Sequence, residues 1–192
     1  MKRVLISLMF VVFFVVVSCG KTSVNSNNTG DSGTKNTGNT GDLETGDTGN
    51  NFLNKHGGLK WSKKAPKSIN WSDAKKYCEN LVEDGYSDWR LPTISELRTL
   101  IKNCPATETG GECGVTDSCL SLRNCRNDAC SGCSGSSDGK YSKLGDTECF
   151  WSFSEESDHA GFAWYVRFSN GYVSNDSDGN DKHYEVYVRC VK

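Results

Sequence analysis

Cysteine is the residue type with the most chemistry to offer in this 192-residue chain, which contains ten of them. Seven lie among Gly, Ser, Asn and Asp in residues 103–149, where apolar residues are too few for a separate core. Neighbouring thiols either form disulfides or bind zinc. Only Cys130 and Cys133 have a familiar zinc-ligand spacing, so we expect no metal and a disulfide-stapled loop, with zinc as the alternative. The disulfide candidates of the loop are Cys104, Cys113, Cys119, Cys125, Cys130, Cys133 and Cys149, the last being either the odd thiol or a tie between its strand and the loop.

Cys19 indicates a different chemistry, the attachment of lipid. Lys2 and Arg3 precede an apolar run from Val4 to Val17 that only Ser7 interrupts. A membrane-spanning helix needs about 20 apolar residues, so residues 1–18 are predicted to be a signal peptide. Small Ser18 before Cys19 and the polar residues after it are typical of a lipobox. We therefore expect a bacterial lipoprotein, and Gly20 after the lipidated cysteine favours the outer membrane.

Residues 19–52 are predicted to be a flexible tether between the lipid and a folded domain. Thr-Gly recurs at 29, 37, 40, 45 and 48, and from Gly20 to Asn51 the only sizeable apolar residues are Val24 and Leu43. Such a segment buries too little surface to offset its ordering entropy. Its root-mean-square span is about 30 Å by the flexible-coil relation. Removal of Lys2 and Arg3 leaves 20 basic and 24 acidic residues, and this mild acidity argues against nucleic acid as a partner.

Catalytic constellations are scarce, and we expect no enzyme and no cofactor. His56, His159 and His183 all lie in polar, loop-like contexts. Cys149 and His159 would be a nucleophile and a base only with an orienting carboxylate and oxyanion donors that the sequence does not place. The acidic residues from Asp176 to Asp181 are predicted to form an exposed turn, with weak cation binding as the alternative.

Two capped helices and several strands must position these residues. Asn70 is predicted to cap a first helix, with Asp73 reaching back to the cap amide, and Trp71, Ala74, Cys78, Leu81 and Val82 forming its buried stripe. Thr93 and Glu96 predict a capping box for a second helix, with Pro92 and Leu97 as a hydrophobic staple.

The C-terminal part is predicted to be rich in strands. Residues 162–168 alternate, and Asn170-Gly171 is typical of a two-residue hairpin turn. Tyr184, Val186, Val188 and Cys190 also alternate. Cys190 therefore shares the buried phase with Cys78, and we expect these two residues to form a disulfide.

Aromatic residues are dense enough to raise the alternative of a sugar-stacking platform. Most of the five tryptophans alternate with polar neighbours, so we expect core packing for each of them. The better surface candidates are Tyr165, Tyr172 and Tyr187.

Four separated blocks of sequence form one pattern, namely Trp71 to Leu81, Trp89-Arg90-Leu91-Pro92-Thr93 with Glu96-Leu97, Trp151-Ser152, and Arg189-Cys190-Val191. This pattern resembles the Lcl C-terminal domain family, a bacterial extracytoplasmic domain of unknown function. The resemblance implies an α+β, C-type-lectin-like fold for residues 53–192, with two helices, a small twisted antiparallel sheet and the loop 103–149 as a Cys-rich insertion. A more distant similarity is to the sulfatase-modifying, formylglycine-generating enzymes, whose reactive cysteine pair has no match here.

A local cluster of lysines suggests the kind of ligand that this chain binds. Six of them crowd residues 60–76 of an otherwise acidic chain, namely Lys60, Lys63, Lys64, Lys67, Lys75 and Lys76. Collagen-like adhesins with this domain bind sulphated glycosaminoglycans, so the resemblance implies an anionic polysaccharide as a partner. The alternative is a solvated basic face.

We expect a lipid-anchored envelope or surface binding module, with an enzyme of the formylglycine-generating type or a purely structural lipoprotein as alternatives. The oligomeric state is left open.

Overall fold

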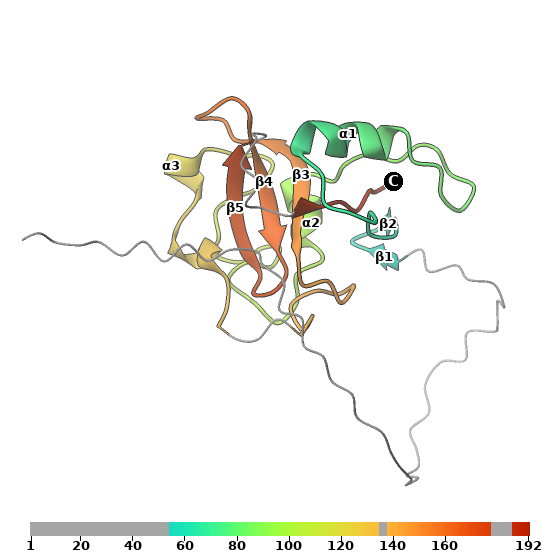
Figure 1. The fold of residues 1–192 in the computed structure, drawn as a ribbon. Coiled ribbons are helices and arrows are strands. Elements are labelled where there is room, and N and C mark those ends of the chain that lie inside the picture. Colours follow the sequence, from blue (N-terminus) through green and yellow to red (C-terminus); the bar gives the residue numbers. More distant parts are fainter. Residues whose placement is uncertain (1–53, 135–137, 178–185) are drawn as a thin grey trace, which may run out of the picture.

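A computed structural model describes residues 54–134, 138–177 and 186–192 of the chain. The signal segment, Cys19, the tether, Asp178, Asp181, His183 and Tyr184 lie outside these residues. Figure 1 shows β1 (Asn54–His56) and β2 (Leu59–Trp61) as a hairpin beside a four-stranded sheet with the order β5-β4-β3-β6. The strands of this sheet are β3 (Cys149–Glu155), β4 (Phe162–Arg167), β5 (Tyr172–Ser177) and β6 (Val186–Tyr187). The helices are α1 (Trp71–Glu79), α2 (Ile94–Arg98), α3 (Leu122–Cys125) and the 3-10 turn η1 (Asp128–Ser131).

The predicted α+β class is confirmed, and two of its details are wrong. The described residues contain a third α-helix inside the Cys-rich loop. The sheet is mixed rather than antiparallel, because β6 runs parallel to β3, with Cys149 opposite Val186 and Phe150 opposite Tyr187. The C-type-lectin-like architecture stays a prediction.

Each face of the sheet carries its own apolar core. Side chains alternate across a strand, so Phe150, Trp164 and Val166 pack on the face covered by α2, whereas Trp151 and Tyr165 pack on the face covered by α1. The central strands β3 and β4 are therefore buried on both sides. Among the described residues, no helix is long and apolar enough to cross a membrane.

Helix α1 begins at the predicted cap. The Asn70 side chain accepts a bond from the Asp73 amide, and its own amide group donates to the Asp73 carboxylate at 3.1 Å, rather than the carboxylate reaching the Asn70 backbone. Trp71, Ala74 and Cys78 are buried as predicted. Val82 is 74% exposed, because the helix ends at Glu79 before the stripe reaches this residue.

Helix α2 carries the predicted capping box. Both bonds between Thr93 and Glu96 are present, and Pro92 and Leu97 are buried. Arg90 adds two bonds to the Glu96 carboxylate, at 2.7 and 2.6 Å, so the start of α2 is fixed from two directions.

The hairpin between β4 and β5 turns where predicted, but its loop is longer. Arg167 and Tyr172 form the last strand pair, which leaves residues 168–171 as a four-residue loop rather than a two-residue turn. Gly171 has φ 71°, and an added Cβ there would meet the Cys104 side chain. Glycine is favoured at this position for both reasons.

Four disulfides join described cysteines. The predicted bond between Cys78 and Cys190 is present, with Cα atoms 5.5 Å apart. The loop cysteines pair as Cys104–Cys133, Cys113–Cys130 and Cys119–Cys125. Both alternatives for Cys149 are wrong: the six loop cysteines pair with one another, so it does not tie its strand to the loop, and it is not a free thiol. This many disulfides indicates an extracytoplasmic domain.

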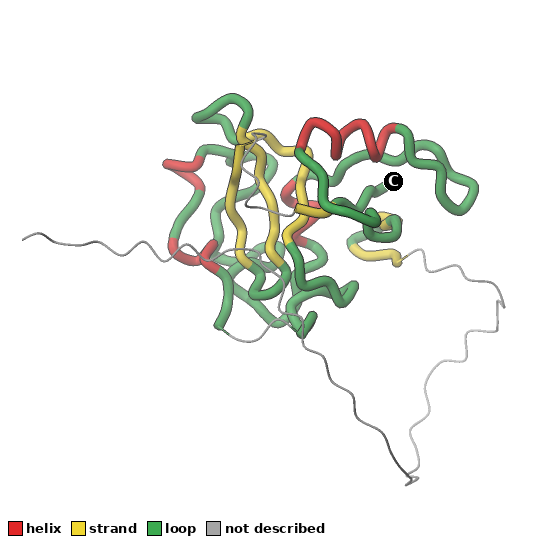
Figure 2. Tube along the Cα trace, viewed as in Figure 1, coloured by secondary structure: helices red, strands yellow, loops and turns green. Residues whose placement is uncertain are grey.

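The Cys-rich loop is part of the main core rather than an appendage. Figure 2 shows how much of the chain between α2 and β3 is loop, and Cys113, Val115 and Tyr141 of this stretch are buried against α2 and the sheet. Arg98, which is 2% exposed, donates to the carbonyls of Thr107, Glu108 and Val115. Burial lowers the pKa of this guanidinium, and its three bonds fix the path of the loop.

Candidate functional site

The six predicted ligand-binding lysines do not form one cluster. Lys60 donates to the Tyr86 hydroxyl at 2.6 Å, Lys64 forms an ion pair with Glu148, and Lys75 lies 3.5 Å from the centre of the Trp71 ring system. Lys76 is 3.6 Å from Asp73, in an exposed pair that contributes little energy. Lys63 and Lys67 are exposed, and their side chains have no partner among the described residues.

The segment that carries Lys63 and Lys67 is held along the C-terminal end of the chain. The amides of Ser62, Ala65 and Ile69 donate to the carbonyls of Cys190, Val188 and Val186, at 2.9, 2.9 and 3.0 Å. These bonds run in antiparallel order and keep residues 62–69 in place. The two lysines therefore project from a fixed backbone.

Lys60 belongs to a second basic group, which the sequence did not predict. Lys192 also approaches Tyr86, with its ammonium 3.7 Å from the ring centre, and bonds Asp88 at 2.6 Å. The hydrogen bond and the charge of Lys60, with a further effect of Lys192, lower the pKa of the Tyr86 phenol.

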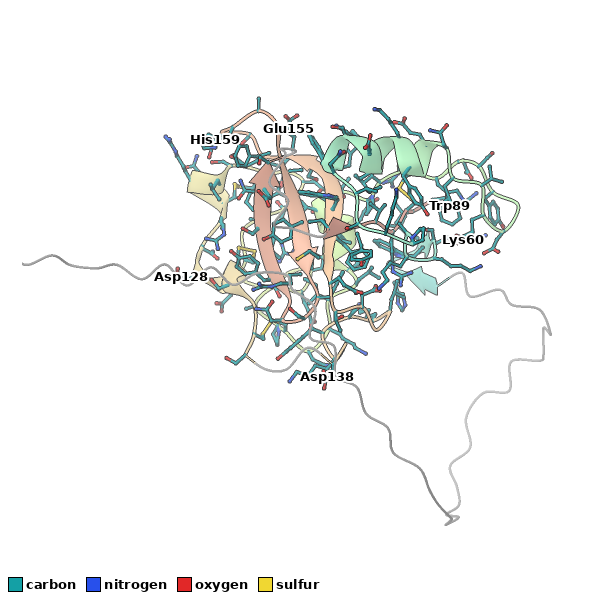
Figure 3. The ribbon with its side chains drawn as sticks, in the orientation of Figure 1. Lys60, Trp89, Asp128, Asp138, Glu155 and His159 are labelled. Carbon is teal, nitrogen blue, oxygen red and sulfur yellow. A yellow bond between two sulfur atoms is a disulfide. The ribbon has the colours of Figure 1, made fainter. Side chains whose placement is uncertain are left out.

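A different group of side chains lines an open depression of about 370 Å³, close to the lower end of the usual range for ligand sites. We call it the Phe153 groove. Figure 3 shows Glu155 of this groove at the end of the sheet beside α1, whereas Lys60 lies apart from it, near the β1–β2 hairpin. The lining residues are Trp71, Lys75, Thr93, Asp117, Leu120, Phe153, Ser154 and Glu155.

Phe153 is 55% exposed because β3 bulges at this point. The pairs Trp151–Tyr165 and Glu155–Ala163 leave three residues of β3 opposite one residue of β4. Within the bulge the Phe153 amide donates to the Pro92 carbonyl at 2.6 Å instead of to β4. Bulges redirect side chains, and this one turns Phe153 out of the core.

The polar walls of the groove are held by hydrogen bonds. The Asp117 carboxylate accepts from the Thr93 hydroxyl at 2.8 Å and from the Ser95 amide at 3.1 Å. Glu155 accepts from the Gly161 amide through Oε1 at 2.8 Å. The Leu120 carbonyl accepts from the Trp164 indole at 3.0 Å. The groove is therefore largely pre-formed.

The sequence did not find Phe153, because regular alternation would place it on the same face as Trp151, in the core. The one local signal is the serine on each side of it. Ser152 bonds the Trp164 carbonyl at 2.7 Å and Ser154 accepts from the Ile94 amide at 2.9 Å, so both serines maintain the irregular backbone.

The predicted aromatic surface candidates are less exposed than expected. Tyr165 is 8% exposed, so its assignment to the surface is wrong, and burial raises the pKa of its phenol. Tyr172 and Tyr187 are half-buried. All five tryptophans are buried, as predicted.

The hypothetical pair of Cys149 and His159 is not assembled. Cys149 begins β3, and His159 follows its far end, so the strand alone separates them by about 20 Å at 3.3 Å per residue. His159 bonds the buried Glu156 carboxylate at 2.7 Å. Within the part of the chain that the structure describes, no group of three metal-ligating side chains occurs.

The comparisons agree with the resemblance. A family model described as the Lcl C-terminal domain matches residues 51–192. A comparison with curated proteins finds no match. Since the family model covers most of the sequence and includes the whole described fold, the chain belongs to the Lcl C-terminal domain family.

Proposed function

We propose that this chain is a lipid-anchored envelope module that binds anionic polysaccharide through the segment 60–76. The observation that carries the proposal is the fixed backbone of residues 62–69, from which Lys63 and Lys67 project into solvent. Cations held by a rigid segment lose little backbone freedom on binding an anionic ligand.

Charge in this segment favours an anionic ligand. Residues 60–76 contain six lysines and one acidic residue, Asp73. Lys76 is available as well as Lys63 and Lys67, because its exposed pair with Asp73 is weak. Lys64 is paired with Glu148, so we leave it out of the binding set.

The proposal also includes the anchor and the architecture. Acylated Cys19 and the tether 19–52 would display many copies of the domain at the outer membrane, and many weak contacts to one polymer add up through avidity. A C-type-lectin-like architecture, as the resemblance implies, is compatible with a binding role. We propose binding rather than catalysis because eight described cysteines are paired in disulfides, which leaves them unable to act as a reactive thiol pair.

Heparin-agarose chromatography of the full-length chain in detergent tests this function. The triple variant Lys63→Gln, Lys67→Gln and Lys76→Gln should elute at clearly lower salt than the wild type, because screening weakens the remaining contacts. A matched control, Lys102→Gln with Arg123→Gln and Lys140→Gln, removes the same charge elsewhere and should elute with the wild type. Flow-through of the wild type, or equal elution of both variants, would contradict the proposal.

A further inference from the structure

The Phe153 groove takes Trp71 and Lys75 from the segment 60–76, but none of the three lysines proposed to bind anions, Lys63, Lys67 and Lys76, lines it, and its chemistry differs. We infer that it binds a neutral pyranose ring of a polysaccharide. The apolar face of the sugar would stack on Phe153, and the sugar hydroxyls would donate hydrogen bonds to the carboxylates of the groove. The inference does not depend on anionic ligands binding at Lys63 and Lys67.

Phe153 is exposed to solvent although it belongs to a central strand. In the described part of the chain, Phe153 and Val82 are the two large hydrophobic side chains that are clearly exposed. Val82 follows a helix end, whereas Phe153 stands over a depression and is turned outward by a bulge with its own hydrogen bonds. An exposed aromatic ring offers apolar area at a low cost in side-chain entropy, which suits the apolar face of a sugar ring.

The charges that line the groove favour a neutral sugar over an anionic one. The groove contains one ammonium, Lys75, and two carboxylates, Asp117 and Glu155. The Lys75 ammonium lies over the Trp71 ring, 3.5 Å from its centre, where the ring attracts it. An anionic sugar would meet a net negative charge here and would be repelled, so this site and the lysine segment prefer different ligands.

The acceptors needed for sugar hydroxyls are in place. Glu155 uses Oε1 for the Gly161 amide, while Oε2 accepts no bond from the described residues. The Asp117 oxygens each accept one protein bond and retain a second lone pair. Because Thr93, Ser95 and the Leu120 backbone are already fixed, binding requires little reorganisation.

Affinity electrophoresis of the full-length chain in detergent tests the inference, with native gels containing hydroxyethyl cellulose, galactomannan or soluble starch. Wild type and the matched control Val82→Ala should be retarded in at least one gel. Phe153→Ala should bind that polysaccharide about tenfold more weakly, which corresponds to the loss of a ring-sized apolar contact. Phe153→Trp should restore the retardation.

Further readouts separate this site from the lysine segment. Phe153→Ala should keep its melting temperature and its elution from heparin, and the triple lysine variant should keep its retardation in the neutral gel. Lack of retardation in all three gels would overturn the inference, as would equal retardation of Phe153→Ala and wild type. Phe153-dependent self-association on size exclusion without retardation would assign the groove to contact between copies and would also overturn it.

Discussion

Cys78 on α1 and Cys190 near the C-terminus are bonded across 112 residues of sequence, with their Cα atoms 5.5 Å apart. The bond joins the helix to the segment that also pairs with β2, since Lys60 and Lys192 exchange two backbone hydrogen bonds at 3.1 Å. It therefore closes nearly the whole described domain into one loop.

Loss of the Cys78–Cys190 bond should destabilise the domain more than loss of the short Cys119–Cys125 bond. Loop-closure entropy gives about 4.8 kcal/mol for the long loop and about 2.2 kcal/mol for the short one. Urea unfolding of the two double Cys→Ala variants measures the difference. Equal decreases in the free energy of unfolding would show that native strain or residual structure in the unfolded chain outweighs loop-closure entropy.

Replacement of Arg98 by Ala should cost about 3 to 5 kcal/mol, because it leaves the Thr107 and Val115 carbonyls inside the Cys-rich loop without a donor and the Glu108 carbonyl with the Gly111 amide alone. Arg90→Ala is the control. Its side chain is 50% exposed in the ion pair with Glu96, so this change should cost about 1 kcal/mol or less. If chemical denaturation gave similar decreases in the free energy of unfolding for Arg98→Ala and Arg90→Ala, the structural role of Arg98 would be contradicted.

Trp89→Ala should destabilise the fold by about 3 to 5 kcal/mol, because this side chain is 3% exposed and packs with the core on the α1 side of the sheet. Phe153→Ala, at an exposed position, should change stability little. A melting temperature of Trp89→Ala that equals that of the wild type would refute the assignment of Trp89 to the core.

The pKa of Tyr86 should lie below that of an ordinary tyrosine, because Lys60 donates to its hydroxyl and both Lys60 and Lys192 favour the phenolate. A lowered folded-state pKa means that the contribution to stability is present above the unfolded pKa and is lost as pH falls through the folded one. Ultraviolet titration of wild type against Tyr86→Phe isolates this phenol. In the Lys60→Gln variant the pKa of the Tyr86 phenol should rise back toward its usual value. An unchanged pKa in this variant would exclude Lys60 as the cause of the shift.

Acylation of Cys19 should anchor the chain to the membrane. Radiolabelled palmitate should enter the wild type and not Cys19→Ala, whereas Ser18→Ala should still be labelled because it keeps a small residue before the cut. Equal labelling of wild type and Cys19→Ala would disprove the lipid anchor.

Local signals determined much of the fold. Asn70 and the Thr93–Glu96 box cap their helices where predicted, since a cap depends on residues only three positions apart. The Cys78–Cys190 bond was also within reach of the sequence, because Cys78 lies on the buried side of α1 and Cys190 continues the alternating burial of Val186 and Val188. The lysine-rich stretch 60–76 is likewise visible as a local excess of one charge, and its binding role stays a prediction.

Long-range packing decided the rest. The pairings among the six loop cysteines depend on which loop segments meet in the core, and no local pattern encodes that. Lys64 left the predicted binding set because Glu148, 84 residues away, lies against it. Phe153 is exposed because a bulge breaks the alternation that would bury it, and the bulge is held by Pro92, Ile94 and Trp164 from distant parts of the chain. Sequence periodicity assumes a regular strand, so it fails at Phe153, where tertiary hydrogen bonds replace the ladder.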